Sequence, residues 1–113
     1  MEITTRDLEN VKVVCFKGRI VYDTEEIVKK ETEKLIKGTV KNLVFNFSEL
    51  TYINSSGLGL LINVLKQIRG AKGDVKLACL RPELMELFKI TSLNSVFDIS
   101  ADEETAISKF TKK

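Results

Sequence analysis

Residues 43–69 read LVFNFSELTYINSSGLGLLINVLKQIR, and this stretch predicts the centre of the fold. Residues 43–47 are almost continuously apolar, as expected of a strand inside a sheet. Residues 48–56 are more polar and are interpreted as a loop, and a helix is expected from about Gly57 to Arg69. Apolar residues at helical spacing form the predicted core face of that helix: Leu58, Leu61, Ile62, Leu65 and Ile68.

The segments on either side continue the alternation of strands and helices. Strands are expected at 1–5, 11–18, 75–80 and 96–99, and helices at 24–36, from Pro82 to near Ile90, and after Ser100. The predicted order is β-β-α-β-α-β-α-β-α. It corresponds to a single α/β domain over residues 1–113, with a mostly parallel, mixed sheet of four or five strands and about four helices. The first strand is expected at an edge, antiparallel to its neighbour.

Helix ends are predicted from residues that satisfy free backbone amides. Asp23, followed three residues later by Glu26, has the form of a capping box for the first helix. Ser100 is expected to cap the last helix. Charged residues of both signs at 25–34 are interpreted as a solvated helix face with weak ion pairs.

Composition excludes several classes of function. The chain has 113 residues, 43% of them hydrophobic and 30% charged, which suits one folded domain. Its 18 basic and 16 acidic residues leave a net charge of only +2, so no nucleic-acid partner is expected. No apolar run is long enough to span a membrane, and residues 1–7 are mixed polar and lack the apolar run of a signal peptide. We therefore expect no membrane partner and a cytoplasmic location.

Chemistry-bearing residues are sparse. Without histidine, neither a Ser-His nor a Cys-His nucleophile pair can be built, and no catalytic residue is expected. Cys15 and Cys79 lie in apolar runs and are interpreted as buried thiols, neither a disulfide nor metal ligands. No phosphate-binding loop is complete, so no cofactor and no metal are predicted.

The segment from Asn54 to Gly59, NSSGLG, is the most specialised part of the chain. It follows a central strand and opens a helix, and in α/β sheets such loops are where ligands meet the protein. The start of a helix presents free amides and a partial positive charge, which favour an anion such as a phosphoryl group. On the residues alone, the simpler interpretation is that Ser55 or Ser56 is an ordinary helix cap.

Residues 45–61, FNFSELTYINSSGLGLL, resemble the signature of the STAS domain family, in particular the bacterial anti-sigma factor antagonists. Residues 16–20 resemble the second strand of that family and its turn, and 93–106 its closing strand and helix. Asn54 stands where the family usually has Asp. Val21 falls where the turn often has Asp, with Asp23 two residues on, and Ser48 also replaces a common Asp.

The resemblance implies a function and a site. In the family, the Ser or Thr before the Gly is phosphorylated by an anti-sigma factor that is also a serine kinase, which here corresponds to Ser56, with Ser55 as second choice. The unphosphorylated protein binds the kinase and releases the sigma factor, and a serine phosphatase reverses the modification. The expected partner-binding residues surround the serine: Asp23, Asn54, Ser55, Gly57, Leu58, Leu60 and Val64.

Two alternatives remain open. Leu60 and Val64 lie off the predicted core face and are either a strip for a partner or buried between the sheet and a neighbouring helix. The domain is either the phosphorylation switch just described or a scaffold that works without phosphorylation, for example as a nucleotide-sensing module. A small enzyme has little support.

Overall fold

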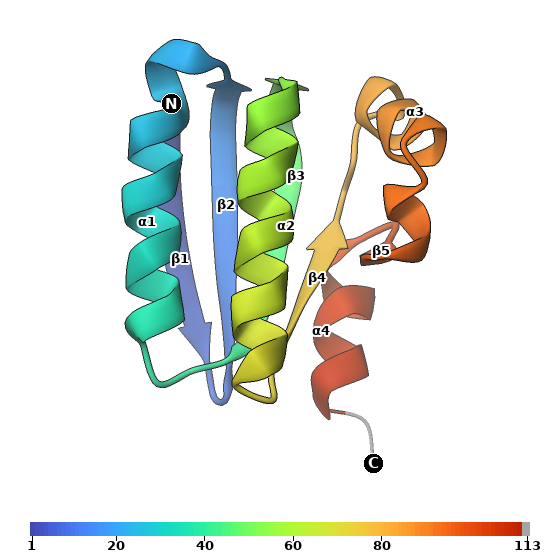
Figure 1. Cartoon of the computed structure of the whole chain (residues 1–113). Coiled ribbons are helices and arrows are strands. Elements are labelled where there is room, and N and C mark those ends of the chain that lie inside the picture. The colour runs from blue at the N-terminus through green and yellow to red at the C-terminus, as the bar shows by residue number, and fades with distance from the viewer. Residues whose placement is uncertain (112–113) are drawn as a thin grey trace.

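The computed structural model describes residues 1–111, in which one five-stranded sheet is covered by helices (Figure 1). The elements follow the predicted order of strands and helices. In chain order they are β1 (Glu2–Leu8), β2 (Val11–Ile20), the short 3-10 turn η1 (Tyr22–Thr24), α1 (Glu25–Lys37), β3 (Asn42–Ile53), α2 (Ser55–Gly70), β4 (Asp74–Ala78), α3 (Pro82–Ile90), the 3-10 turn η2 (Leu93–Ser95), β5 (Asp98–Ser100) and α4 (Glu103–Thr111).

The strands lie in the sheet in chain order, β1-β2-β3-β4-β5. β1 and β2 form an antiparallel hairpin at one edge, and every other neighbouring pair is parallel. The prediction of a mixed, mostly parallel sheet with an antiparallel edge strand is confirmed. Because β2, β3 and β4 are parallel, their carboxyl ends lie at the same edge of the sheet.

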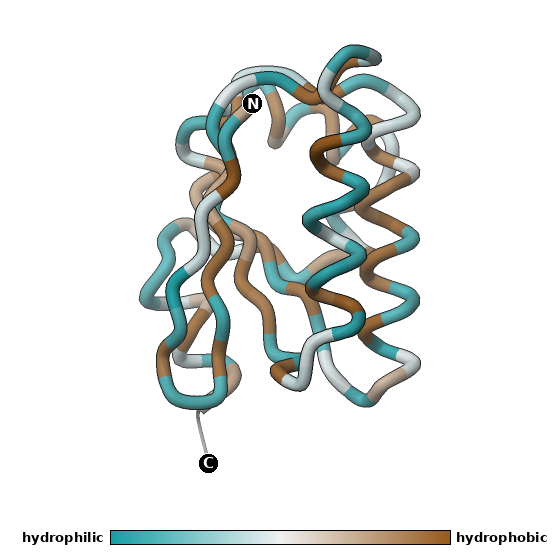
Figure 2. The backbone as a smooth tube through the Cα atoms, turned by 90° about the vertical axis from the view of Figure 1, so that its left-hand side faces the viewer, coloured by the Kyte–Doolittle hydropathy of each residue, from teal (hydrophilic) through white to brown (hydrophobic). Residues whose placement is uncertain are grey.

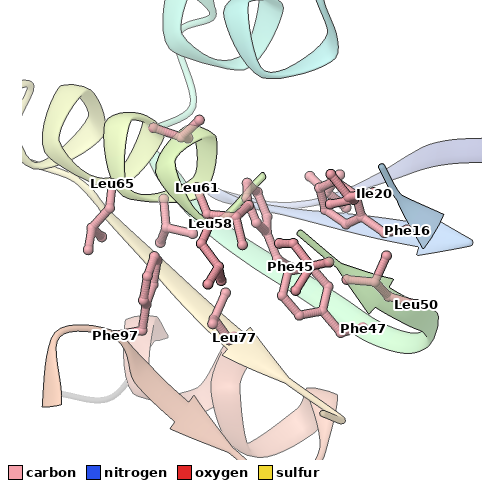
Figure 3. Packing of buried hydrophobic residues seen from close by; sticks show 14 of the residues in the cluster. Phe16, Ile20, Phe45, Phe47, Leu50, Leu58, Leu61, Leu65, Leu77 and Phe97 are labelled. Atoms are coloured by element: carbon pink, nitrogen blue, oxygen red, sulfur yellow. The ribbon is translucent and has the colours of Figure 1, made fainter. Parts of the chain in front are cut away.

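Alternate residues along the strands serve two different cores. Phe45 of β3 belongs to the larger cluster, which also includes core residues of α1, α2 and α3, whereas its neighbour Val44 belongs to a smaller cluster that includes Ala106 of α4. α1 and α2 therefore form a layer on one face, seen edge-on in Figure 2, and α4 covers part of the other. Figure 3 shows Leu58 and Leu61 of α2 facing the sheet across the larger core.

The predicted loop at 48–56 is wrong for most of its length, because β3 continues to Ile53. The pairing of β2 with β3 shifts register between Cys15 and Lys17 and again between Gly18 and Arg19, so extra residues of β3 are accommodated. Each shift interrupts the two-residue alternation of burial, although Leu50 and Ile53 are buried again further along. A pattern read as polar loop is thus a bulged strand.

Neither predicted cap is used. Thr24 is the residue before α1, and Thr24 Oγ1 accepts a hydrogen bond from the Val21 amide at 2.9 Å, so Asp23 forms no capping box. At α4 the cap is Asp102, which accepts from the Thr105 amide at 2.7 Å, whereas Ser100 is a buried residue of β5. Both predictions fail because α1 begins one residue later, and α4 two residues later, than local composition suggests.

Smaller differences concern the C-terminal half and the thiols. β4 ends at Ala78, two residues before the prediction, because Cys79 has a φ of +64°, which no strand accommodates. The last strand is Asp98–Ser100. Cys15 and Cys79 are free thiols and are half-buried beside the smaller core. Burial raises the pKa of both thiols, which favours their protonated form.

Candidate functional site

The candidate site lies where β2 and β3 end and the helices that follow them begin. The backbone amide of Asn54 donates to the carbonyl of Ile20 at 3.0 Å, which ties the last residue of β2 to the start of α2. η1 follows β2 after one residue and leads directly into α1, and α2 likewise follows β3 after one residue. The N-termini of α1 and α2 therefore lie side by side at one edge of the sheet (Figure 1).

Asn54 is the cap of α2. Its side-chain Oδ1 accepts a hydrogen bond from the Gly57 amide at 2.8 Å, and its backbone carbonyl accepts from the Leu58 amide at 3.0 Å. The interpretation of Ser55 or Ser56 as the cap is therefore wrong, since both lie within the first turn of the helix. Freed from that task, the Ser56 hydroxyl is available for another contact.

Ser56, Asn54 and Glu25 form a hydrogen-bonded cluster between the two helices. The Ser56 hydroxyl donates to Oε2 of Glu25, and Nδ2 of Asn54 donates to the same oxygen at 2.8 Å. The Ser56 hydroxyl also lies 3.4 Å from Oδ1 of Asn54. One carboxylate oxygen of α1 is thus shared by two donors at the start of α2.

Hydrogen bonding stabilises the ionised form of Glu25. The bond from Ser56 and then the bond from Asn54 lower the pKa of the Glu25 carboxyl below its ordinary value, against a small opposing effect of burial. Both donors belong to the start of α2, where the free amides of a helix carry a partial positive charge. The side chain is consequently anionic at neutral pH.

Gly57 permits the close approach of the two strand ends. A Cβ at this position would lie 2.6 Å from Cγ2 of Ile20 and 2.9 Å from Oδ1 of Asn54. Any larger residue would therefore press on both the core and the cap. Gly57 is buried beneath Ser56 and has no surface to offer a partner.

The residues predicted to bind a partner divide into exposed and buried groups. Ser55, Ser56 and Asp23 are exposed, and Asn54 and Leu60 are half-buried. Val64 is only 1% exposed and belongs to the larger core, where α1 packs against α2. For Val64 the open alternative is decided in favour of burial, and a surface strip that includes it is excluded.

An apolar groove lies beside Ser55, the residue before Ser56. This cavity of about 400 Å³ lies between the end of β3, the start of α2 and α3. Asn54, Ser55 and Leu58 line it on one side and Leu84 and Leu87 on the other. The predicted residue Leu58, although largely buried, thus has an edge on this groove.

Glu25 is the site residue that the sequence interpretation missed. It was placed with the charged residues of a solvated helix face, a pattern that held no signal for a contact with Ser56. The available clue was topological, because parallel strands followed by helices bring successive helix starts to one edge.

Acidic and apolar side chains surround the serine, and no metal-binding group is evident among residues 1–111. Tyr22 is 86% exposed, and together with Asp23, Glu25 and Glu26 it lines a shallow acidic hollow beside the cluster. Within the same described range, no three His, Cys, Asp or Glu side chains lie close enough to hold a metal ion. Nor does any helix described here have the length and apolarity to cross a membrane.

Comparison with known proteins gives consistent relatives. Residues 2–106 match the STAS domain. The anti-sigma-B factor antagonist of Listeria monocytogenes is 30% identical over 101 residues, covering 88% of this chain and 86% of the relative. The unphosphorylated form of the anti-sigma factor antagonist SpoIIAA superimposes with a TM-score of 0.81 at 20% identity, covering 99% of this chain and 98% of that one. For the phosphorylated form of this Bacillus protein the TM-score is 0.73 at 21% identity, covering 96% and 99%.

Proposed function

The chain belongs to the STAS domain family, and we propose that it is an anti-sigma factor antagonist whose binding state is set by phosphorylation of Ser56. Unphosphorylated, it binds an anti-sigma factor that is also a serine kinase and so releases a sigma factor for transcription. Phosphorylated, it lets the kinase go, and a serine phosphatase restores the first state. The domain itself is a cytoplasmic binding module and not an enzyme.

The observation that carries this proposal is the placement of Ser56. Its hydroxyl is exposed in the first turn of α2, at the edge of the sheet where ligands of α/β proteins usually bind. The structure assigns helix capping to Asn54, so Ser56 can be modified without losing the cap. SpoIIAA, which shares the fold, has been solved in both a phosphorylated and an unphosphorylated form.

Electrostatics explains how a phosphoryl group would release a partner. Phosphorylation adds about −1.5 to −2 charges at pH 7. On Ser56 this charge would lie next to the carboxylate of Glu25 and near Asp23 and Glu26 in the acidic hollow. A partner that docks over the acidic hollow when Ser56 is neutral would have to desolvate the added charge in a close interface.

The surface proposed for the kinase extends from Ser56 into the apolar groove. Ser55 and Leu58 line this groove directly beside the serine, so one partner could cover both. Apolar side chains of the kinase in the groove would supply affinity, and the serine would supply the switch. We therefore retain a docking role for the groove residues Asn54, Ser55 and Leu58.

A scaffold that works without phosphorylation is the second candidate, and one observation favours it. The Ser56 hydroxyl is already engaged by Glu25 and is not a free nucleophile. In that case Ser56 and Glu25 would serve only to join α1 to α2, within a larger signalling assembly or as a nucleotide-sensing module. Titration with nucleotides separates a nucleotide sensor from a plain switch.

Incubation of the protein with ATP and its cognate kinase tests the first candidate. Intact-mass measurement should show one added phosphate, peptide mapping should place it on Ser56, and Ser56→Ala should abolish it. Ser55→Ala is the matched control and should still be modified. A phosphate found elsewhere, or none in the presence of a kinase that binds, would contradict the proposal and favour the scaffold.

A further inference from the structure

Glu25 is the carboxylate that contacts the reacting atom of the proposed switch. Its Oε2 accepts the hydroxyl hydrogen of Ser56, and Asn54 Nδ2 holds the same oxygen in place from 2.8 Å. The contact joins different elements, since Glu25 is the first residue of α1 and Ser56 the second of α2. The arrangement orients the Ser56 oxygen and aims its proton at an anion.

We propose that Glu25 is the positioning residue of Ser56 and the acceptor of its proton during phosphoryl transfer. This inference rests on the proposed function. Phosphoryl transfer depends mainly on positioning, and a carboxylate that accepts the proton of the attacking hydroxyl is a recurring part of it. Here the protein substrate would supply that carboxylate, with its geometry already set before the kinase binds.

The step balances with a nucleoside triphosphate held by the kinase. The Ser56 oxygen forms a bond to the γ-phosphorus while the bond from that phosphorus to the β,γ-bridging oxygen breaks, and the nucleoside diphosphate leaves. The hydroxyl proton passes to Oε2 of Glu25 and from there to water. The lowered pKa of the Glu25 carboxyl keeps the acceptor ionised at neutral pH, while making it a weaker base, so the contribution of Glu25 rests on its position beside the hydroxyl.

Asn54 provides a second position from which a carboxylate could act. Its Oδ1 lies 3.4 Å from the Ser56 oxygen and also accepts from the Gly57 amide. An aspartate at 54 would keep this cap, because Asp and Asn are equally good caps. In a chain that carries both Glu25→Gln and Asn54→Asp, the amide at 25 can donate to the carboxylate at 54, which reverses the native polarity of that bond.

Steady-state phosphorylation of the whole chain by its kinase tests the inference. Glu25→Gln keeps size and an acceptor oxygen but cannot take a proton, so kcat should fall on the order of 10²-fold with KM little changed. Adding Asn54→Asp should recover most of the loss. Glu33→Gln, an exposed position further along the same helix, is the matched control and should behave as wild type.

The outcomes separate three cases. If Glu25→Gln leaves kcat unchanged, or if the double variant is as slow as the single one, Glu25 is not the acceptor. If Glu25→Gln raises KM alone, Glu25 is a docking contact and the inference is wrong. If the wild-type protein binds the kinase and takes no phosphate, the proposed function itself fails and this inference falls with it.

Discussion

The hydroxyl of Ser56 donates a hydrogen bond to the carboxylate of Glu25, a residue 31 positions earlier in the chain. The bond joins the first turns of α1 and α2 at the edge of the sheet where β2 and β3 end. It places an anion beside the proposed phosphorylation site before any phosphate arrives. Modification of Ser56 must therefore replace an attractive contact between the two helices with a repulsive one.

Titration should reveal this contact directly. The pKa of the Glu25 carboxyl should lie below its unfolded value of about 4.3, and Ser56→Ala should raise it, because the hydroxyl is the larger cause of the lowering. Carbon-13 NMR of the side-chain carboxyl measures both. Equal Glu25 pKa values in the two proteins would contradict the hydrogen bond.

The same contact has a consequence for stability against pH. A carboxyl whose pKa is lower in the folded than in the unfolded protein stabilises the fold at pH values above its unfolded pKa. That contribution is lost as the pH falls through the folded pKa of Glu25. The difference in free energy of unfolding between wild type and Ser56→Ala should thus shrink from pH 6 to pH 3 in urea titrations. A constant difference would argue against the charge-assisted bond.

Two glycines of α2 should respond in opposite ways to alanine. Gly57→Ala places a Cβ 2.6 Å from Ile20 and should lower the free energy of unfolding by about 1–3 kcal/mol. Gly59→Ala meets nothing within 4 Å and should raise it by up to about 1 kcal/mol, through helix propensity. Urea denaturation measures both, and a tolerated Gly57→Ala would show that the strand ends can separate.

Val64 should matter for folding and not for the partner. Because it is 1% exposed, Val64→Ala should lower the free energy of unfolding by about 2 kcal/mol, from lost burial and a residual cavity. Kinase affinity, measured by calorimetry on the folded variant, should stay within about threefold of wild type. Leu60→Ala, at a half-buried position of the same helix, is the comparison variant for Val64→Ala in both measurements. A selective loss of affinity in Val64→Ala would mean that α1 moves aside on binding.

The apolar groove should contribute to docking. Leu87→Ser removes an apolar wall of the groove and should weaken kinase binding by roughly 10-fold or more. Ile90→Ser changes a residue of the same helix that is 73% exposed outside the groove, and its affinity should be that of wild type. Equal affinities for the two variants would remove the groove from the proposed interface. Circular dichroism of both proteins shows whether α3 is retained.

Local pattern predicted the elements but not their ends. Leu43 to Phe47 and the helix after Gly57 were found because continuous apolarity and helical spacing report burial. The strand beyond Ser48 was missed because two register shifts interrupt its alternation. Capping was assigned to the wrong residues because the first residue of each helix was misplaced by one or two positions. The structure shows that Asn54 caps α2 and Asp102 caps α4.

By itself, the sequence determined the order of strands and helices, the apolar faces, and a serine at the start of a helix after a central strand. These are consequences of residues near one another in the chain. The tertiary structure alone decided that Glu25 meets Ser56 and that Val64 is buried under α1. Periodicity shows that one face of a helix or strand will be buried. Which element buries that face depends on strand register and helix packing. These join residues far apart in sequence.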